Sequence, residues 1–275
     1  MRYEVIHLKE FYPVLDRNGA DPTLEMMIQD DILPDKPRPS MIVCPGGGYH
    51  MISNGEAQNV GFEYMTMGCN AFVIRYSIKP HQFPQQLIEL ACAVDYVVTN
   101  AKSWNGDPEK TCLIGFSAGG HLAASYCTLR NCDEVKAFIP ETKPVQAAIL
   151  CYPVITAELP THLGSFQVLS GKEEWDEDDT ERLSCNRHVD PSITPPTFIW
   201  TTADDFVVDA SNTLKYATEL QKAKIPFELH IFPTGYHGLT TCRYSTVNNT
   251  RHPMCEYMNC WTDMTKKWLR TIFNI

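Results

Sequence analysis

Residues 113–121 read Leu113-Ile114-Gly115-Phe116-Ser117-Ala118-Gly119-Gly120-His121. An apolar run enters a Gly-x-Ser-x-Gly motif, and a helical pattern of small residues follows it. This order of strand, sharp turn and helix is the context that a nucleophile elbow requires. Because the turn strains the backbone of the serine, the positions two residues before and after it need almost no side chain. Gly115 and Gly119 meet that need, so Ser117 is the candidate nucleophile.

Strand patterns and helical patterns alternate along the rest of the chain. Strands are predicted at residues 23–28, 41–44, 71–74, 111–114, 147–151, 197–200 and 227–231. Helices are predicted at residues 56–67, 87–98, 212–223 and 254–272, besides the helix that follows Ser117. This alternation predicts an α/β fold with a mostly parallel sheet and helices on both faces. Because the chain has no internal repeat and no linker-like composition, we expect a single domain over residues 1–275.

One region interrupts the alternation. Between Val154 and Pro195 the pattern is irregular and includes an acidic run at residues 173–179. Loops of this length are usually functional or disordered. One interpretation is a solvated surface insertion, and the other is a cap that shapes the acyl or alcohol pocket. The predicted fold therefore carries a cap-like insertion at about residues 155–195.

The overall charge restricts the partners. The chain has 23 basic and 33 acidic side chains, which is a formal net charge of −10 at pH 7 with histidine neutral. Nucleic acid and anionic membrane surfaces would repel such a protein, so neither is predicted as a partner. The first ten residues lack an apolar core of signal-peptide length, and no run of about 18 apolar residues occurs. We therefore expect a cytoplasmic protein; a homo-oligomer is compatible with the sequence, but no pattern specifies one.

Eleven cysteines are scattered along the chain, and none forms a Cys-x-x-Cys motif. Several lie within apolar strand or helix patterns, which favours reduced thiols that act as small hydrophobic side chains. His252, Cys255 and Cys260 lie near one another in sequence, but their spacing matches no usual zinc pattern. We predict no metal and no organic cofactor.

The partners of a catalytic serine are expected further along the chain. A serine hydroxyl becomes a good nucleophile when a base takes its proton and a carboxylate orients that base. In a sheet of this kind the chain order is Ser, then Asp or Glu, then His. Asp204 and Asp205 follow the strand at 197–200, and His237 follows the strand at 227–231. His237 is the predicted base; at this point either aspartate can be the acid, and the other then fixes the loop or faces solvent.

A glycine run follows the buried strand at 41–44, as Pro45-Gly46-Gly47-Gly48-Tyr49-His50. Three consecutive glycines carry a backbone entropy cost. A strand-end loop that keeps them usually needs free amides or unusual dihedral angles, a flexible turn being the alternative. The amides of Gly47, Gly48 and Ala118 are the predicted donors of an oxyanion hole, where one donor typically contributes about 3–4 kcal/mol.

Three other side chains lie near these motifs. Tyr49 and His50 flank the glycine run and are candidates for lining the acyl pocket. His121 lies one helical turn after Ser117 and points away from the elbow, which predicts a packed or capping histidine.

These motifs resemble the esterase/lipase branch of the α/β-hydrolase superfamily, near acetyl esterases and acetyl-xylan-esterase-like sugar-ester hydrolases. The similarity extends over nearly the whole chain, from Pro45 through the Ser117 motif to residues 226–238. In this family the catalytic aspartate precedes a short valine-rich segment. Asp205 precedes Phe206-Val207-Val208, so the resemblance implies Asp205 as the acid. Related lipases often have His-Gly-Gly-Gly at the oxyanion loop; Pro45 replaces that histidine, which leaves the amides in place and affects how the loop is anchored.

The resemblance implies a serine carboxylesterase that hydrolyses short-chain, acetyl-type esters of sugars or small alcohols through an acyl-enzyme. Its partner would be a small-molecule ester such as an acylated carbohydrate. Three alternatives stay open. An amidase or formamidase would share the mechanism, and a prolyl-oligopeptidase-like peptidase uses the same triad order but usually carries a large additional domain, for which this chain has no room. A non-catalytic binding protein of this fold typically lacks a triad residue.

Overall fold

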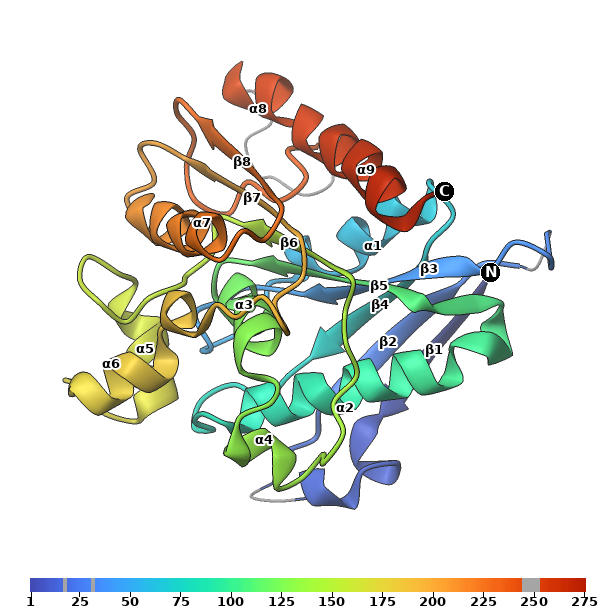
Figure 1. The fold of residues 1–275 in the computed structure, drawn as a ribbon, viewed down its shortest axis with the longest axis horizontal. Helices are drawn as coiled ribbons and strands as arrows, with labels where there is room; N and C mark the ends of the chain where they lie inside the picture. The colour runs from blue at the N-terminus through green and yellow to red at the C-terminus, as the bar shows by residue number, and fades with distance from the viewer. Residues whose placement is uncertain (17–18, 31–32, 244–252) are drawn as a thin grey trace.

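The computed structural model describes residues 1–16, 19–30, 33–243 and 253–275. An eight-stranded sheet lies at its centre, with strand order β1-β2-β4-β3-β5-β6-β7-β8 (Figure 1). Its strands are β1 (Arg2–His7), β2 (Thr23–Ile28), β3 (Arg38–Cys44), β4 (Asn70–Arg75), β5 (Gly106–Phe116), β6 (Ala147–Cys151), β7 (Thr197–Thr202) and β8 (Phe227–Phe232). β2 is antiparallel to both of its neighbours, β1 and β4. β4, β3 and β5 to β8 are parallel to one another. The predicted mostly parallel sheet is confirmed.

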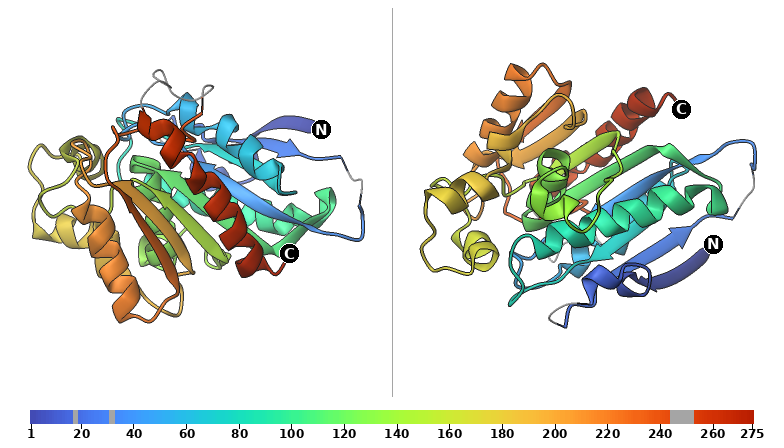
Figure 2. Two further views of the ribbon diagram at one scale, coloured as in Figure 1. Left: turned by 90° about the horizontal axis from the view of Figure 1, so that it is seen from above. Right: turned by 60° about the horizontal axis from the view of Figure 1, so that its bottom comes forward.

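Helices cover both faces of this sheet (Figure 2). The α-helices are α1 (Gln58–Met65), α2 (Gln85–Asn100), α3 (Ala118–Leu129), α4 (Asp133–Lys136), α5 (Leu163–Ser170), α6 (Glu177–Leu183), α7 (Ser211–Lys222), α8 (Pro253–Met258) and α9 (Cys260–Phe273). α2, α3 and α7 pack in one hydrophobic core with strand residues such as Ile42 and Leu113. α1 and α9 pack in a second core with the alternate strand residues, such as Met41 and Ile114. Successive strand side chains point to opposite faces, so each central strand contributes to both cores.

The structure differs from the prediction at both ends of the chain. The edge strand β1 escapes the sequence patterns because Ile6 is its one buried side chain, so it has no apolar run. The helix predicted at 254–272 is divided at Asn259 into α8 and α9. None of the described helices combines the length and the apolar character needed to cross a membrane.

The insertion at residues 155–195 is more regular than predicted, because it contains α5, α6 and a short 3-10 helix at Cys185–His188. The acidic run leads into α6: Asp176 caps this helix by accepting the Asp179 amide, and three acidic residues occupy its first turn. Acidic side chains are favourable there because they face the positive end of the helix dipole. At eight and seven residues, α5 and α6 are too short to show a clear helical period.

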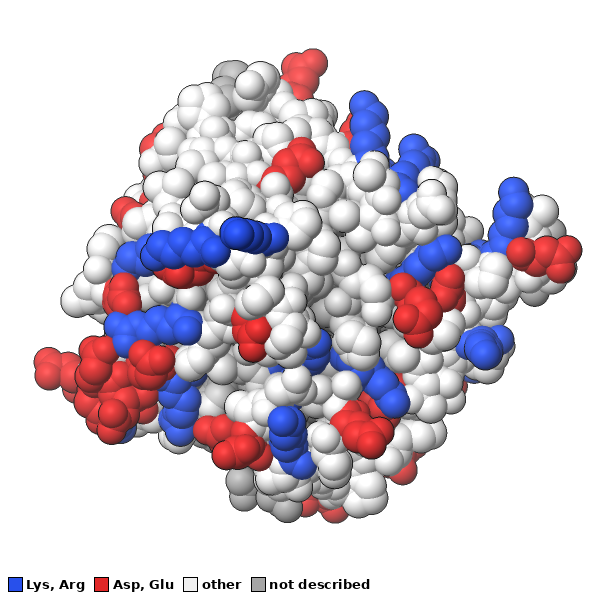
Figure 3. All heavy atoms as spheres, in the orientation of Figure 1, with Lys and Arg blue, Asp and Glu red and all other residues white. Residues whose placement is uncertain are grey.

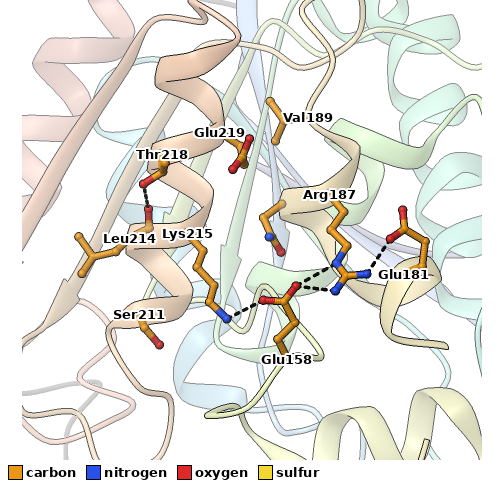
Figure 4. Close-up of a pocket in the computed structure, with 10 residues that line it drawn as sticks. Glu158, Glu181, Arg187, Val189, Ser211, Leu214, Lys215, Thr218 and Glu219 are labelled. Atoms are coloured by element: carbon orange, nitrogen blue, oxygen red, sulfur yellow. Dashed lines mark hydrogen bonds and ion pairs between the residues drawn. The ribbon is translucent and has the colours of Figure 1, made fainter. Parts of the chain in front are cut away.

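Ion pairs attach the insertion to α7. Glu158 accepts hydrogen bonds from Lys215 at 2.8 Å and from Arg187 at 2.6 Å, and Arg187 also pairs with Glu181 (Figure 4). These residues line a hollow of about 640 Å³. Figure 3 shows acidic side chains gathered over this end of the molecule, beside basic ones. Because the four charged side chains named above pair with one another, we interpret the hollow as part of the attachment of the insertion to α7.

The parallel register brings four loops to one edge of the sheet. β3 leads into the glycine run, β5 into Ser117, β7 into the two aspartates and β8 into the loop that carries His237. Carboxyl ends of parallel strands share an edge, which is where open α/β sheets bind ligands. The fold therefore places the candidate residues from four distant segments together.

Candidate active site

The turn at Ser117 has the strained geometry that the motif predicts. Ser117 lies between β5 and α3 with φ 52° and ψ −119°, a backbone conformation that is uncommon for a residue with a side chain. A Cβ atom on Gly119 would lie 2.1 Å from the carbonyl oxygen of Cys44, and one on Gly115 would lie 2.3 Å from the carbonyl oxygen of Gly119. Neither distance is sterically possible, so the two glycines allow β3, β5 and α3 to meet at the elbow.

The structure brings Ser117, His237 and Asp205 into one chain of contacts. His237 Nε2 lies 2.8 Å from Ser117 Oγ, and His237 Nδ1 lies 2.7 Å from Asp205 Oδ2. The Asp205 side chain is 1% exposed and that of His237 is 14% exposed. A neutral imidazole with its proton on Nδ1 donates to Asp205 and accepts the serine hydroxyl. This is the geometry that general-base activation of a hydroxyl needs.

The two neighbouring aspartates hold different loops. Asp205 accepts the backbone amides of Val207 and Val208 with its second oxygen, at 2.9 and 3.0 Å. Asp204 instead accepts the amide of Gly235 at 2.8 Å and the hydroxyl of Thr234. It therefore fixes the loop that leads to His237, while Asp205 contacts the imidazole.

The glycine run adopts a tight loop beside Ser117. Gly47 has φ 126°, and a Cβ atom on it would lie 2.1 Å from the carbonyl oxygen of Met51, so the turn requires glycine. Within the described part of the chain, the amides of Gly47, Gly48 and Ala118 donate to no acceptor. The hydrogen bonds of the described residues therefore use none of the three predicted donors.

A buried pair that the sequence analysis missed supports this loop. Glu56 is 4% exposed, and its carboxylate accepts the Gly46 amide at 2.8 Å and the Tyr152 hydroxyl at 2.7 Å. Burial raises the pKa of Glu56. The Tyr152 hydroxyl also accepts the amide of Thr240, and its ring lies edge-on to His237 with centroids 4.9 Å apart. The pair therefore connects the glycine loop to the segment that carries His237.

Glu56 also explains how the loop is held when Pro45 replaces a histidine. The Tyr76 hydroxyl donates to the carbonyl oxygen of Pro45 at 2.6 Å, while Glu56 holds the next amide. In the sequence Glu56 lies at the start of a predicted helix and Tyr152 just after a predicted strand. Neither position has a local signal, because the contact joins residues 96 apart.

The three side chains near the motifs have different environments. His121 is buried as predicted: its Nδ1 contacts the Tyr49 hydroxyl and its Nε2 contacts the carbonyl oxygen of Leu183, each at 2.8 Å. Burial lowers the pKa of His121 to about 4. Tyr49, a candidate for the acyl pocket, lies in the core at 1% exposure. His50 is exposed and lines a surface hollow.

The insertion adds His162, which the sequence analysis did not identify. A Cβ atom on Gly48 would lie 3.3 Å from His162 Cε1, so this imidazole lies directly against the glycine loop. Burial lowers the pKa of His162, and the neighbouring His237 and His50 lower it further. The segment around His162 carried no motif, so its placement depends on the folded insertion.

No group of three or more metal-ligating side chains occurs among the residues that the structure describes. His252, part of the cysteine–histidine cluster considered in the sequence, lies outside the described residues.

The BD-FAE family model matches residues 31–220. The chain belongs to the BD-FAE family. This BD-FAE protein is 37% identical over 232 residues to endo-1,4-beta-xylanase B of Butyrivibrio fibrisolvens, covering 81% of this chain and 35% of that protein. It is 32% identical over 214 residues to the acetylxylan esterase of Xylanibacter ruminicola, covering 75% of this chain and 42% of that protein. The chain thus spans less than half the length of these two relatives.

A solved structure resembles this BD-FAE protein over its whole length. It is the acetyl ester-xyloside bifunctional hydrolase from Caldicellulosiruptor lactoaceticus, with 34% identity, a TM-score of 0.85, and coverage of 100% of this chain and 98% of that one. Together with the sheet order and the elbow, this similarity confirms the α/β-hydrolase fold and the resemblance to esterases.

Proposed function

We propose that this BD-FAE protein is a serine carboxylesterase that hydrolyses short-chain, acetyl-type esters of sugars or small alcohols. The observation that carries the proposal is the contact chain from Ser117 through His237 to Asp205, beside three amides that have no acceptor among the described residues. The acetylxylan esterase and the acetyl ester-xyloside hydrolase named above support acetylated sugars as the substrate class.

In the first half of the reaction, Ser117 Oγ attacks the ester carbonyl carbon while His237 Nε2 takes its proton. The carbonyl oxygen becomes an oxyanion, which the amides of Gly47, Gly48 and Ala118 stabilise. His237 then gives the proton to the alcohol oxygen as the carbon–oxygen bond breaks. The alcohol leaves, and the acyl group remains bound to Ser117.

In the second half, a water molecule attacks the acyl carbon while His237 Nε2 accepts a proton from it. The oxyanion forms again at the same amides. Its collapse breaks the bond to Ser117 Oγ, which recovers the proton from His237, and the carboxylic acid leaves. In both halves Asp205 stabilises the imidazolium and keeps its orientation.

The test measures hydrolysis of p-nitrophenyl acetate, butyrate and octanoate, and of p-nitroacetanilide, by the parent and the Ser117→Ala variant. We expect rapid acetate cleavage that decreases with acyl length, and a kcat lowered about 10⁴-fold or more by Ser117→Ala. Circular dichroism checks that the variant is folded. A variant within tenfold of the parent would remove Ser117 from the mechanism. Preference for the anilide would favour an amidase, and a folded parent that cleaves no ester would overturn the proposal.

A further inference from the structure

His162 presents a hydrogen-bond donor next to the proposed oxyanion hole. This residue caps α5: its Nδ1 accepts the Ser165 amide at 3.2 Å, and the Ser165 hydroxyl, 2.8 Å from Nδ1, can donate to the same nitrogen. Because Nδ1 accepts a hydrogen, the neutral ring carries its own proton on Nε2. Burial lowers the pKa of His162, so the ring is neutral near pH 7. In the described part of the chain, Nε2 of His162 makes no hydrogen bond.

The Cε1 edge of the ring, which lies between its two nitrogens, faces the loop of Gly48. A Cβ atom on Gly48 would lie 3.3 Å from His162 Cε1, which is bonded to both Nδ1 and Nε2. Since Nδ1 contacts Ser165, Nε2 is the nitrogen next to Cε1 that is left for a ligand. His162 is also close enough to His237 and Asp205 for their charges to act on it. The ring therefore lies near the proposed catalytic groups, although it comes from the insertion and not from the strand ends.

The surroundings of His162 favour contact with the alcohol portion of the ester. His237 returns its proton to the alcohol oxygen, so the alcohol must lie on the His237 side of the site. His50 continues the surface beyond His162, since a Cβ atom on Gly164 would lie 3.4 Å from His162 Cε1 and 3.6 Å from His50 Nε2.

Beyond His50 the surface opens into a hollow of about 580 Å³, whose lining includes Lys79, Gln82, Gln167 and Lys172. These side chains offer several donors and acceptors at the open surface. Such a lining matches a polyhydroxylated alcohol better than a hydrocarbon, because hydroxyl groups keep their hydrogen bonds on binding.

We propose that His162 is a positioning residue whose Nε2–H donates to an oxygen of a sugar-like alcohol, so that the site prefers acetylated saccharides to aryl acetates. The proposal rests on the esterase function proposed above.

The experiment compares His162→Asn and His162→Gln with the parent. Asparagine is a good N-cap, so His162→Asn can keep the cap of α5 but lacks a donor at the position of Nε2. Glutamine is longer and its amide nitrogen can reach that position. His188→Asn is the matched control, because His188 lies in the same insertion and its ring contacts the carbonyl oxygen of Glu181.

The readout is kcat and KM for an O-acetylated methyl xyloside and for p-nitrophenyl acetate. We expect His162→Asn to lower the ratio of kcat/KM for the sugar ester to kcat/KM for the aryl ester at least tenfold, mainly through a higher KM for the sugar ester. His162→Gln should recover part of this ratio, and His188→Asn should leave it unchanged. Thermal unfolding of each variant checks that the insertion is intact.

Several outcomes would overturn this role. An equal loss on both esters would make His162 a structural or general catalytic residue, and an unchanged ratio would mean that it does not contact the alcohol. A parent that cleaves p-nitrophenyl acetate through Ser117 but not the sugar ester would overturn the role of His162 while the esterase function stands. A parent inactive on both esters would overturn both proposals.

Discussion

Asp204 and Asp205 occupy adjacent positions and hold different parts of the site. Asp205 is the nearly inaccessible partner of His237, and two backbone amides fix its second oxygen. Asp204 holds the loop of Thr234 and Gly235. Two adjacent residues therefore serve as a proposed catalytic carboxylate and as a loop anchor.

Asparagine at each position distinguishes these two roles. We expect Asp205→Asn to lower kcat about 10⁴-fold, because an amide nitrogen cannot accept from His237 Nδ1 and the imidazole adopts the wrong tautomer. We expect Asp204→Asn to lower kcat less than about tenfold, because its amide oxygen still accepts one hydrogen bond of the loop. Rates with p-nitrophenyl acetate measure both effects. If Asp204→Asn were the more damaging change, the assignment of the acid would be reversed.

At the scale of elements, α3 connects the elbow to the glycine loop and to the insertion. It begins at the elbow, and one turn later His121 contacts the glycine loop through Tyr49 and the end of α6 through Leu183. Both contacts need a neutral imidazole, with Nδ1 accepting and Nε2–H donating. One of the contacts that attach the insertion near the site therefore depends on the protonation of a buried ring.

This dependence predicts a loss of stability in acid. The pKa of His121 is about 4 in the folded chain and about 6.5 in an unfolded one, so the folded state binds the proton more weakly. The contribution of the neutral His121 ring to the free energy of unfolding is complete above pH 6.5. It is lost as the pH falls, by about 3 kcal/mol at pH 4. We expect the free energy of unfolding of the parent to fall toward that of His121→Gln over this range, measured by urea titration.

A second measurement does not depend on the variant. Histidine NMR of the parent should show one imidazole that stays neutral below pH 5. Two results would contradict the prediction. One is that the free energies of unfolding of the parent and of His121→Gln change in parallel with pH, and the other is that the His121 imidazole titrates near pH 6.5.

At the scale of the whole molecule, the two cores on opposite faces of the sheet enclose most of the cysteines. All eleven are free thiols; Cys132 and Cys260 are half-buried and the other nine are buried. Burial raises the pKa of both half-buried thiols as well. The thiols act as small apolar side chains, as their positions in apolar patterns predict.

Thiol labelling of the native protein tests this arrangement. With a disulfide reagent at pH 7.5 we expect no more than two thiols to react before the protein unfolds, and slowly, since the thiolate is the reactive form. In denaturant all eleven should react. Rapid labelling of three or more thiols in the native state would mean that one core is open to solvent.

The positions of Ser117 and His237 could be predicted because each has a local cause, whereas the local pattern left Asp204 and Asp205 open and the family resemblance pointed to Asp205. The elbow needs glycine on either side of a strained serine, and strand ends in a parallel sheet place the acid and the base at the same edge. β1 and the two short helices of the insertion were missed, since the strand buries one side chain and the helices are shorter than the pattern needs.

The sequence by itself determined the α/β fold, the order of the three contact residues and the glycine loop, because these follow from steric limits and apolar periods within short segments. Only the tertiary structure decided that Glu56 and Tyr152 support that loop and that His162 reaches it from the insertion. These contacts join side chains far apart in the chain. Their formation depends on how buried polar groups find partners once the sheet and the insertion have packed, which no local pattern specifies.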